Sequence, residues 1–370
     1  MNIATSRRNL AALISWAIGV RLFCATSMDG ALLMNSGWIS VLLSLVMALP
    51  FALIVALLSR RDPGTSPLAL MDRALCPLAR RMFCGLLALC SLYEFALSLR
   101  LITLSAEFSG LDHQPMLLIS SVSTSTALIA CLGGAAAISG TVMLWRPLYH
   151  SLMVLLVVVL SGSISPRWLF PLLGPGVRQI ALSAISFAGM QTSLVAGWLC
   201  MGEETGESQF GGKPYRTTGP YLLLRTLLRF AFIGGSLTLL MCMLSPAMPN
   251  APSERDFYLE QFLANDQNAT LFQFPLIFIW FINQAIMLCF FLFTAAHLLW
   301  VSCPKLSFRT SLLIATALGF TFSLSTFASR IHIDSVNTVR YLVVLLCLTC
   351  FGIGHALKQR KEGRLSHDAP

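Results

Sequence analysis

Long apolar runs set the strongest limit on how this chain folds. Runs of about 20 apolar residues, the length that crosses the hydrocarbon core of a bilayer as a helix, recur along the chain between short polar breaks. The sequence is 56% hydrophobic and only 11% charged, unlike an ordinary soluble domain. A membrane barrel would show short alternating segments, and a soluble α/β protein would show apolar runs of roughly 4–8 residues. The sequence therefore predicts an all-α integral membrane protein.

We predict about ten transmembrane helices and treat residues 1–370 as a single polytopic membrane domain. The predicted spans are 10–28, 37–59, 82–108, 115–137, 142–164, 177–202, 219–245, 269–300, 308–329 and 338–357. The first five-helix repeat covers 10–164, the second covers 177–357, and a tail follows at 358–370. Most basic residues flank the spans on the side that holds both ends of the chain, so the positive-inside rule places both termini in the cytoplasm.

The net charge of +9 does not indicate a nucleic-acid partner, because the basic residues lie mostly at helix ends rather than in one patch. The sequence has no zinc-ligand spacing, nucleophile triad or phosphate-binding turn, and little sequence outside the spans. We therefore expect no catalytic residues, no metal site and no cofactor, and we expect that the protein is not an enzyme.

Ten spans divide into two halves of five, and the first span of each half carries a glycine interruption. Gly19 lies within the first span, and Ser186, Phe187, Ala188 and Gly189 lie within the sixth. Matching interruptions are typical of inverted-repeat transporters, in which two broken helices meet near the middle of the membrane. Glycine also serves close helix packing in membranes, which is the alternative reading.

Short motifs at these places resemble a known family. They are Ile18-Gly19-Val20, Gly37-Trp38-Ile39-Ser40, Leu169-Phe170-Pro171-Leu172-Leu173-Gly174-Pro175-Gly176 and Ser186-Phe187-Ala188-Gly189. Their order and spacing resemble the spore germination AB family, the membrane-embedded B subunit of nutrient germinant receptors in the amino acid-polyamine-organocation transporter superfamily. The resemblance implies a LeuT-like five-plus-five inverted repeat with broken helices one and six, in the inner membrane of a bacterial spore. It also implies partners: an A-type membrane subunit, a C-type lipoprotein and membrane lipid.

The resemblance further implies a pocket between helices one and six for a small germinant, in which half-helix N-termini face an amino-acid carboxylate. The candidate ligand-binding residues are Gly19, Val20, Arg21, Phe187, Ala188, Gly189 and Asn283. For Phe187 the alternative is plain packing, and for Asn283 it is an interhelical hydrogen bond.

Arg21 departs from the superfamily pattern, which usually has a small residue there. An arginine at this depth keeps its proton and requires a partner, and Glu94 in the third span is the best candidate within the chain. Three readings stay open for Arg21: an ion pair with Glu94, a clamp for a ligand carboxylate, or a fixed charge in place of a coupling cation. Gln191 is a second departure, because related sequences more often have an acid there, which disfavours proton coupling.

Three functions compete on the sequence. The first is a transporter-like receptor subunit that binds a germinant, expected to be an amino acid, and signals to its partner subunits. The second is a secondary transporter of amino acids or cations, which Arg21 and Gln191 disfavour. The third is a scaffold subunit with a vestigial pocket.

Overall fold

The structure of the chain is a computed structural model. It describes residues 7–28, 34–61, 66–106, 115–161, 165–200 apart from 171 and 175, 228, 270–324 and 330–367. The predicted seventh span, 219–245, lies outside the described residues except for residue 228.

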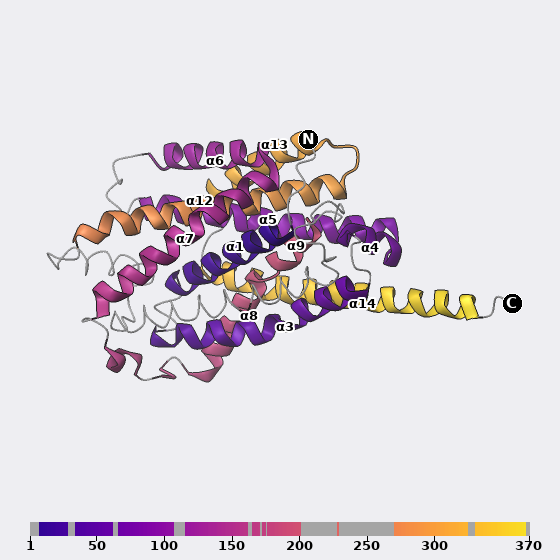
Figure 1. Cartoon of the computed structure of the whole chain (residues 1–370), viewed down its shortest axis with the longest axis horizontal. Coiled ribbons are helices and arrows are strands. Elements are labelled where there is room, and N and C mark those ends of the chain that lie inside the picture. Colours follow the sequence, from indigo (N-terminus) through magenta and orange to yellow (C-terminus); the bar gives the residue numbers. More distant parts are fainter. Residues whose placement is uncertain are drawn as a thin grey trace, which may run out of the picture.

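Every regular element in the described part of the chain is helical (Figure 1). The elements are α1 (Arg7–Met28), η1 (Met34–Ser36), α3 (Gly37–Arg61), α4 (Pro67–Ala74), α5 (Pro77–Ala106), α6 (Met116–Leu132), α7 (Gly134–Leu160), η4 (Pro166–Leu169), α8 (Val177–Met190), α9 (Ser193–Leu199), α12 (Thr270–Ser302), α13 (Phe308–Leu324) and α14 (Arg330–His367). The predicted all-α membrane fold is confirmed, and the tail from residue 358 continues α14 as helix to His367.

Most predicted spans correspond to described helices. Five helical segments are long and apolar enough to cross a membrane: Gly37–Leu58, Pro77–Thr103, Val177–Leu199, Phe278–Ser302 and Ser335–Lys358. The first and ninth predicted spans correspond to the shorter apolar helices Asn9–Leu22 and Phe308–Leu324. The fourth and fifth correspond to α6 and α7, which are apolar enough together but bent by 110° at their junction.

The junction of α6 and α7 lies at two glycines. Gly134 has φ +79°, a conformation that other residues rarely adopt, so the chain can turn here within two residues. The predicted gap between these spans, 138–141, is therefore wrong by several residues, because glycine geometry rather than polarity ends α6.

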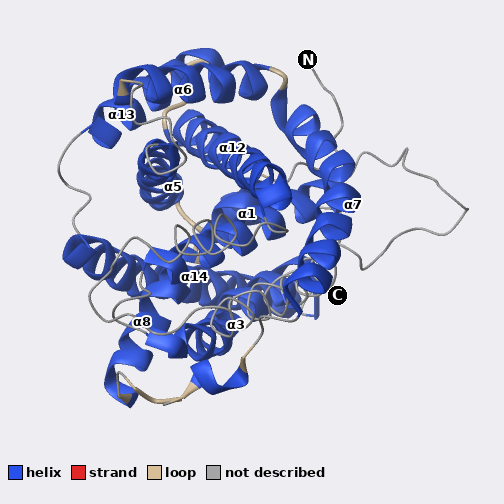
Figure 2. Cartoon of the chain, turned by 90° about the vertical axis from the view of Figure 1, so that its left-hand side faces the viewer, coloured by secondary structure: helices blue, strands red, loops and turns tan. Residues whose placement is uncertain are grey.

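The helices form a bundle whose centre is the pair α5 and α12, with α1 beside them (Figure 2). On one side α3, α8 and α14 pack against one another, and on the other side α6 and α13 cover α5 and α12. The short helix α9 contacts α1, α3, α5 and α12, and Gly197 permits this approach since a Cβ there would lie 2.6 Å from the Ile14 side chain. The second piece of the sixth span is thus held in the core.

Two of the motifs that suggested the family each take part in a hydrogen bond between the region of α3 and the region of α8. Ser36 Oγ, directly before α3, donates to the Leu172 carbonyl oxygen at 2.6 Å, and Ser40 Oγ donates to the Ile180 carbonyl oxygen at 3.2 Å. Gly176 has φ +86° and leads into α8, so this position requires glycine. The two bonds connect the start of α3 to the segment before α8 and to α8 itself.

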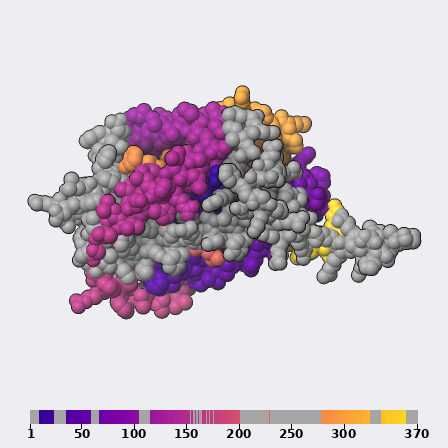
Figure 3. Space-filling view, viewed as in Figure 1, coloured from indigo at the N-terminus to yellow at the C-terminus, as the bar shows by residue number. Residues whose placement is uncertain are grey.

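The exposure pattern is that of a membrane protein. Large apolar side chains lie on the outside, as at Ile129 (70% exposed) and Leu144 (81%), whereas Arg21 and Glu94 are buried. The helices α6 and α7, which carry many of these exposed apolar residues, cover much of the upper face in Figure 3. Soluble monomers rarely expose so much contiguous apolar surface, and a hydrocarbon surrounding accounts for it.

The expected break in the first helix is wrong, because α1 continues from Arg7 to Met28 through Gly19. A single glycine costs a helix about 1 kcal/mol relative to alanine, which does not end it. The next residues, Val20 and Arg21, both accept helical geometry, and Arg21 replaces the second small residue that the superfamily pattern would supply.

Candidate functional site

The sixth span is interrupted where the sequence predicted. Its first piece, α8, ends at Met190, and its second piece, α9, begins at Ser193. Across the gap the backbone hydrogen bonds tighten to three-residue spacing, with Gln191 N donating to Ala188 O at 3.1 Å and Thr192 N donating to Gly189 O at 3.2 Å. The interruption therefore frees carbonyl oxygens at the end of α8 from ordinary helical bonding.

Polar side chains satisfy these freed carbonyls. Thr192 Oγ1 donates to the Gly189 carbonyl oxygen at 2.8 Å, and Ser193 Oγ donates to the Met190 carbonyl oxygen at 2.9 Å. Arg340 on α14 donates from Nε to the same Gly189 oxygen at 2.8 Å. A cation at the C-terminal end of α8 also interacts favourably with the helix dipole. The break is thus held by one residue from a distant helix as well as by its own.

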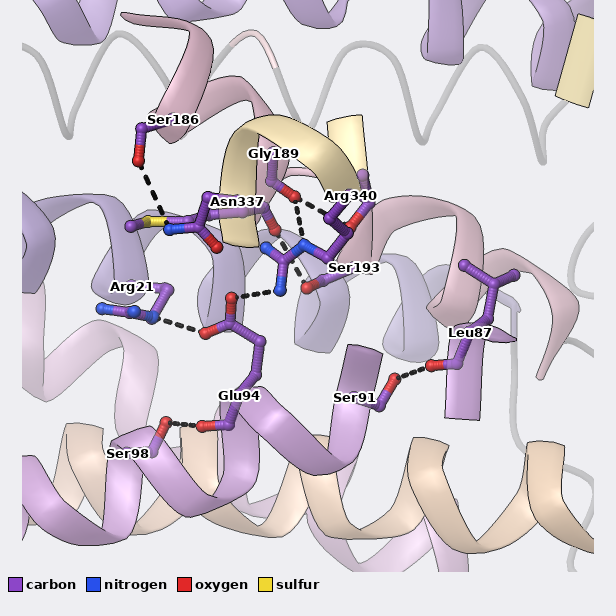
Figure 4. Close-up of polar contacts among 12 residues, drawn as sticks. Arg21, Leu87, Ser91, Glu94, Ser98, Ser186, Gly189, Ser193, Asn337 and Arg340 are labelled. Carbon is purple, nitrogen blue, oxygen red and sulfur yellow. Dashed lines mark hydrogen bonds and ion pairs between the residues drawn. The ribbon is translucent and has the colours of Figure 1, made fainter. Parts of the chain in front are cut away.

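The same arginine joins a buried ion network (Figure 4). Arg340 Nη1 lies 2.6 Å from Glu94 Oε1, and Arg21 Nε donates to Glu94 Oε2 at 2.6 Å. One carboxylate on α5 therefore connects α1 to α14, and through Arg340 to the break in the sixth span. The structure brings together Arg21 and Glu94, the two residues that the sequence suggested as a pair.

The network is almost completely shielded from solvent. The side chains of Arg21, Glu94 and Arg340 are 1%, 0% and 3% exposed. Two guanidinium groups and one carboxylate leave these three residues with a net charge of +1, and arginine does not lose its proton to relieve it. Several buried polar atoms nearby make no hydrogen bond with any described residue, namely Arg340 Nη2, Asn337 Oδ1 and Gln191 Oε1.

Arg340 was not expected at the site. The predicted tenth span begins at 338, which puts Arg340 near the end of a helix, whereas α14 begins at Arg330. The sequence carries little signal for this, because residues 341–353 are apolar on nearly every face of a helix. In the structure the buried positions of α14 follow helical spacing at Asn337, Arg340, Val344, Leu348, Phe351 and His355, so Arg340 lies on the inward face.

The other predicted ligand-binding residues lie in the packed interior. Gly19 is buried and Val20 half-buried on α1, while Phe187 and Ala188 are fully buried on α8. Gly189 lies against α14, where a Cβ would be only 2.0 Å from the Asn337 carbonyl oxygen. In this structure Gly189 therefore serves close approach of two helices, the alternative reading of these glycines.

Asn283 on α12 bonds to α7 rather than to the ion network. Trp145 Nε1 on α7 donates to Asn283 Oδ1 at 3.0 Å, so Asn283 makes the interhelical hydrogen bond that was its alternative role. Gln191, at the break, donates from Nε2 to Ser44 Oγ on α3 at 2.9 Å.

Within the described residues, no group of three or more His, Cys, Asp or Glu side chains could hold a metal ion.

The sequence profile of a family described as spore germination protein matches residues 7–195, slightly more than half of the chain. The chain belongs to this spore germination protein family. The match includes Arg21, Glu94 and the break in the sixth span, but ends before Arg340. The family expected from the short motifs is confirmed. No curated protein matches the chain significantly.

The fold of this spore germination protein is similar to a solved structure of Mhp1, a nucleobase-cation-symport-1 family transporter, in a closed conformation with bromovinylhydantoin bound. The TM-score is 0.63 at 14% sequence identity, over 94% of this chain and 80% of that chain. This similarity confirms the transporter-like fold class. The repeat boundaries 10–164 and 177–357 stay predictions.

Proposed function

We propose that this protein is the transporter-like membrane subunit of a spore nutrient germinant receptor. It binds a small germinant, an amino acid, and passes the event to an A-type membrane subunit and a C-type lipoprotein. The protein lies in the inner membrane of the spore with both termini in the cytoplasm. It binds its ligand and signals, without a catalytic step. Family membership and the transporter-like fold support it.

The observation that carries the proposal is the Arg21–Glu94–Arg340 network. It joins α1, α5 and α14 to the break in the sixth span through charge-assisted contacts at 2.6 Å and a bond to the Gly189 carbonyl at 2.8 Å. A ligand that competes for any of these contacts changes the balance between two arrangements of the bundle. Partner subunits then respond to the resulting difference in packing at the surface that they contact.

A binding function also fits the similarity to Mhp1, whose solved structure holds bromovinylhydantoin. Transport is less well supported here, because two fixed cations in a low-dielectric interior disfavour a coupling cation at the same place. A receptor needs only the conformational difference, not the full cycle of alternating access.

Spore germination is the direct test. In a strain without paralogous receptors, deletion of this chain is expected to abolish the response to at least one nutrient amino acid, while a nutrient-independent trigger still works. Wild-type protein restores the response. Normal germination of the deletion strain with every nutrient tried contradicts the proposal. Purified protein in liposomes that accumulates labelled amino acid against a gradient favours a transporter instead.

A further inference from the structure

Arg340 has hydrogen-bonding capacity that the described protein leaves unused. Its Nε is committed to the Gly189 carbonyl and its Nη1 to Glu94, but its Nη2 has no hydrogen-bond partner among the described residues. The side chain is only 3% exposed, so bulk water does not supply the missing acceptor. A guanidinium group presents its N–H donors as a planar fork that matches the two oxygens of a carboxylate.

The charge of the network points to the same kind of partner. Arg340 shares the single Glu94 carboxylate with Arg21 and contacts only one of its two oxygens. A second anionic group beside Nη2 interacts favourably with this buried guanidinium group, whereas a cationic group is repelled by it.

The surroundings of Arg340 are polar rather than simply packed. Asn337, one turn earlier on α14, bonds to Ser186 Oγ through Nδ2 at 3.4 Å and has an unused Oδ1 with respect to the described residues. Gln191 Oε1, at the break itself, likewise lacks a partner in the described part of the chain. Three unsatisfied polar atoms near one helix interruption are better explained by an absent polar ligand than by packing.

We propose that Arg340 is the residue that binds the carboxylate of the germinant, through Nη2 at the break between α8 and α9. This inference rests on the proposed receptor function and names its ligand chemistry. It differs from the expected arrangement, in which half-helix N-termini on the first and sixth helices hold the carboxylate. Since α1 is continuous and α8 presents its C-terminal end here, an arginine is the better anion donor.

The proposal also explains how binding is sensed. A carboxylate at Nη2 competes with Glu94 and with the Gly189 carbonyl for the same guanidinium group. Because Glu94 also holds Arg21, a weaker Arg340–Glu94 contact changes the connection between α14 and α1. The ligand thus acts on two helices through a single charge.

The test compares acids with their amides on purified full-length protein. Each of the twenty L-amino acids and its carboxamide is titrated against the wild type in detergent, in chloride-free buffer, and binding is followed by thermal stabilisation and calorimetry. The amide has nearly the same shape but no negative charge. We expect the best amino acid to bind about 10- to 100-fold more tightly than its amide.

Arg340→Gln is the decisive variant. It leaves Arg21 and Glu94 as a neutral pair and keeps a donor for the Gly189 carbonyl, so no charge is stranded. We expect acid binding to weaken about 10- to 100-fold and the preference for acid over amide to disappear. A second variant, Arg340→Gln with Glu94→Gln, keeps the wild-type net charge but lacks the guanidinium group, and the same loss is expected.

The matched control is Arg100→Gln on α5, which makes the same change in an arginine that contacts Met116 Sδ rather than the network. It is expected to keep the preference for acid. The carboxylate subsite is overturned if the wild type binds acid and amide with equal affinity, or if the preference for acid survives Arg340→Gln. The receptor function still stands in either case if amino acids bind. Stabilisation by chloride alone also overturns it. Arg340-dependent binding of acids, together with normal germination of the deletion strain, supports the subsite and rejects the receptor.

Discussion

Helix α1 and the α8–α9 pair occupy corresponding places in the two halves of the chain, and both carry a glycine, yet only the second is interrupted. The residues after each glycine differ. Val20 and Arg21 directly follow Gly19 and stay in the helix, whereas Thr192 and Ser193, three and four residues after Gly189, donate to the carbonyl oxygens that the break releases.

The comparison teaches that glycine alone does not break a membrane helix. Without water, each freed carbonyl needs a donor from the protein, and hydroxyl side chains three residues on provide it locally. A third donor, Arg340, comes from α14. An interruption therefore forms where local and distant donors coincide, and Glu94 links that interruption to the uninterrupted α1.

The largest effect is expected at Glu94, which the two regions share. Glu94→Ala leaves two buried guanidinium groups facing each other and is expected to destabilise the protein by about 3–5 kcal/mol or to prevent its accumulation. Arg21→Ala leaves a neutral Arg340–Glu94 pair and should be the mildest change. The double variant leaves one buried cation and should lie between them. Thermal unfolding of the purified variants gives the order, and a double variant more stable than Arg21→Ala would show that Arg340 does not belong to the network.

The next effect is expected at Gly189. Gly189→Ala places a Cβ about 2.0 Å from the Asn337 carbonyl oxygen, so α8 and α14 have to separate, at a cost of about 1–3 kcal/mol or more. Gly140→Ala on α7 is the control, because a Cβ there meets nothing within 4 Å and alanine favours the helix. Membrane abundance and melting temperature measure both. An unchanged melting temperature for Gly189→Ala would mean that the close approach is not needed for stability.

The smallest effect is expected at Thr192. Thr192→Val keeps the shape but removes one of three donors to the Gly189 carbonyl, for a loss of about 1 kcal/mol. Thr141→Val on α7 removes a similar hydroxyl bond to Ala137, but on an exposed face of an uninterrupted helix, and should cost less. Equal melting temperatures for the two variants would argue that the break does not depend on its local donors.

The sequence predicted much of the fold because membrane insertion depends on local composition. Apolar runs located most of the helices, and Arg21 and Glu94 stood out since a charge within such a run requires a partner. Prediction failed at helix boundaries: glycine conformation moved the end of α6, and α14 begins eight residues before the predicted span. The second error hid Arg340.

By itself, then, the sequence determined that the chain forms apolar membrane helices, that the sixth span is interrupted, and that Arg21 requires an acidic partner. Tertiary structure decided that the first helix stays continuous, that Gly189 packs against α14, and that Glu94 is shared with Arg340. The physical reason is that hydropathy is a property of neighbouring residues. Which buried donor meets which acceptor depends on the rotation and packing of helices that are far apart in the chain, and Glu94 and Arg340 are separated by 246 residues.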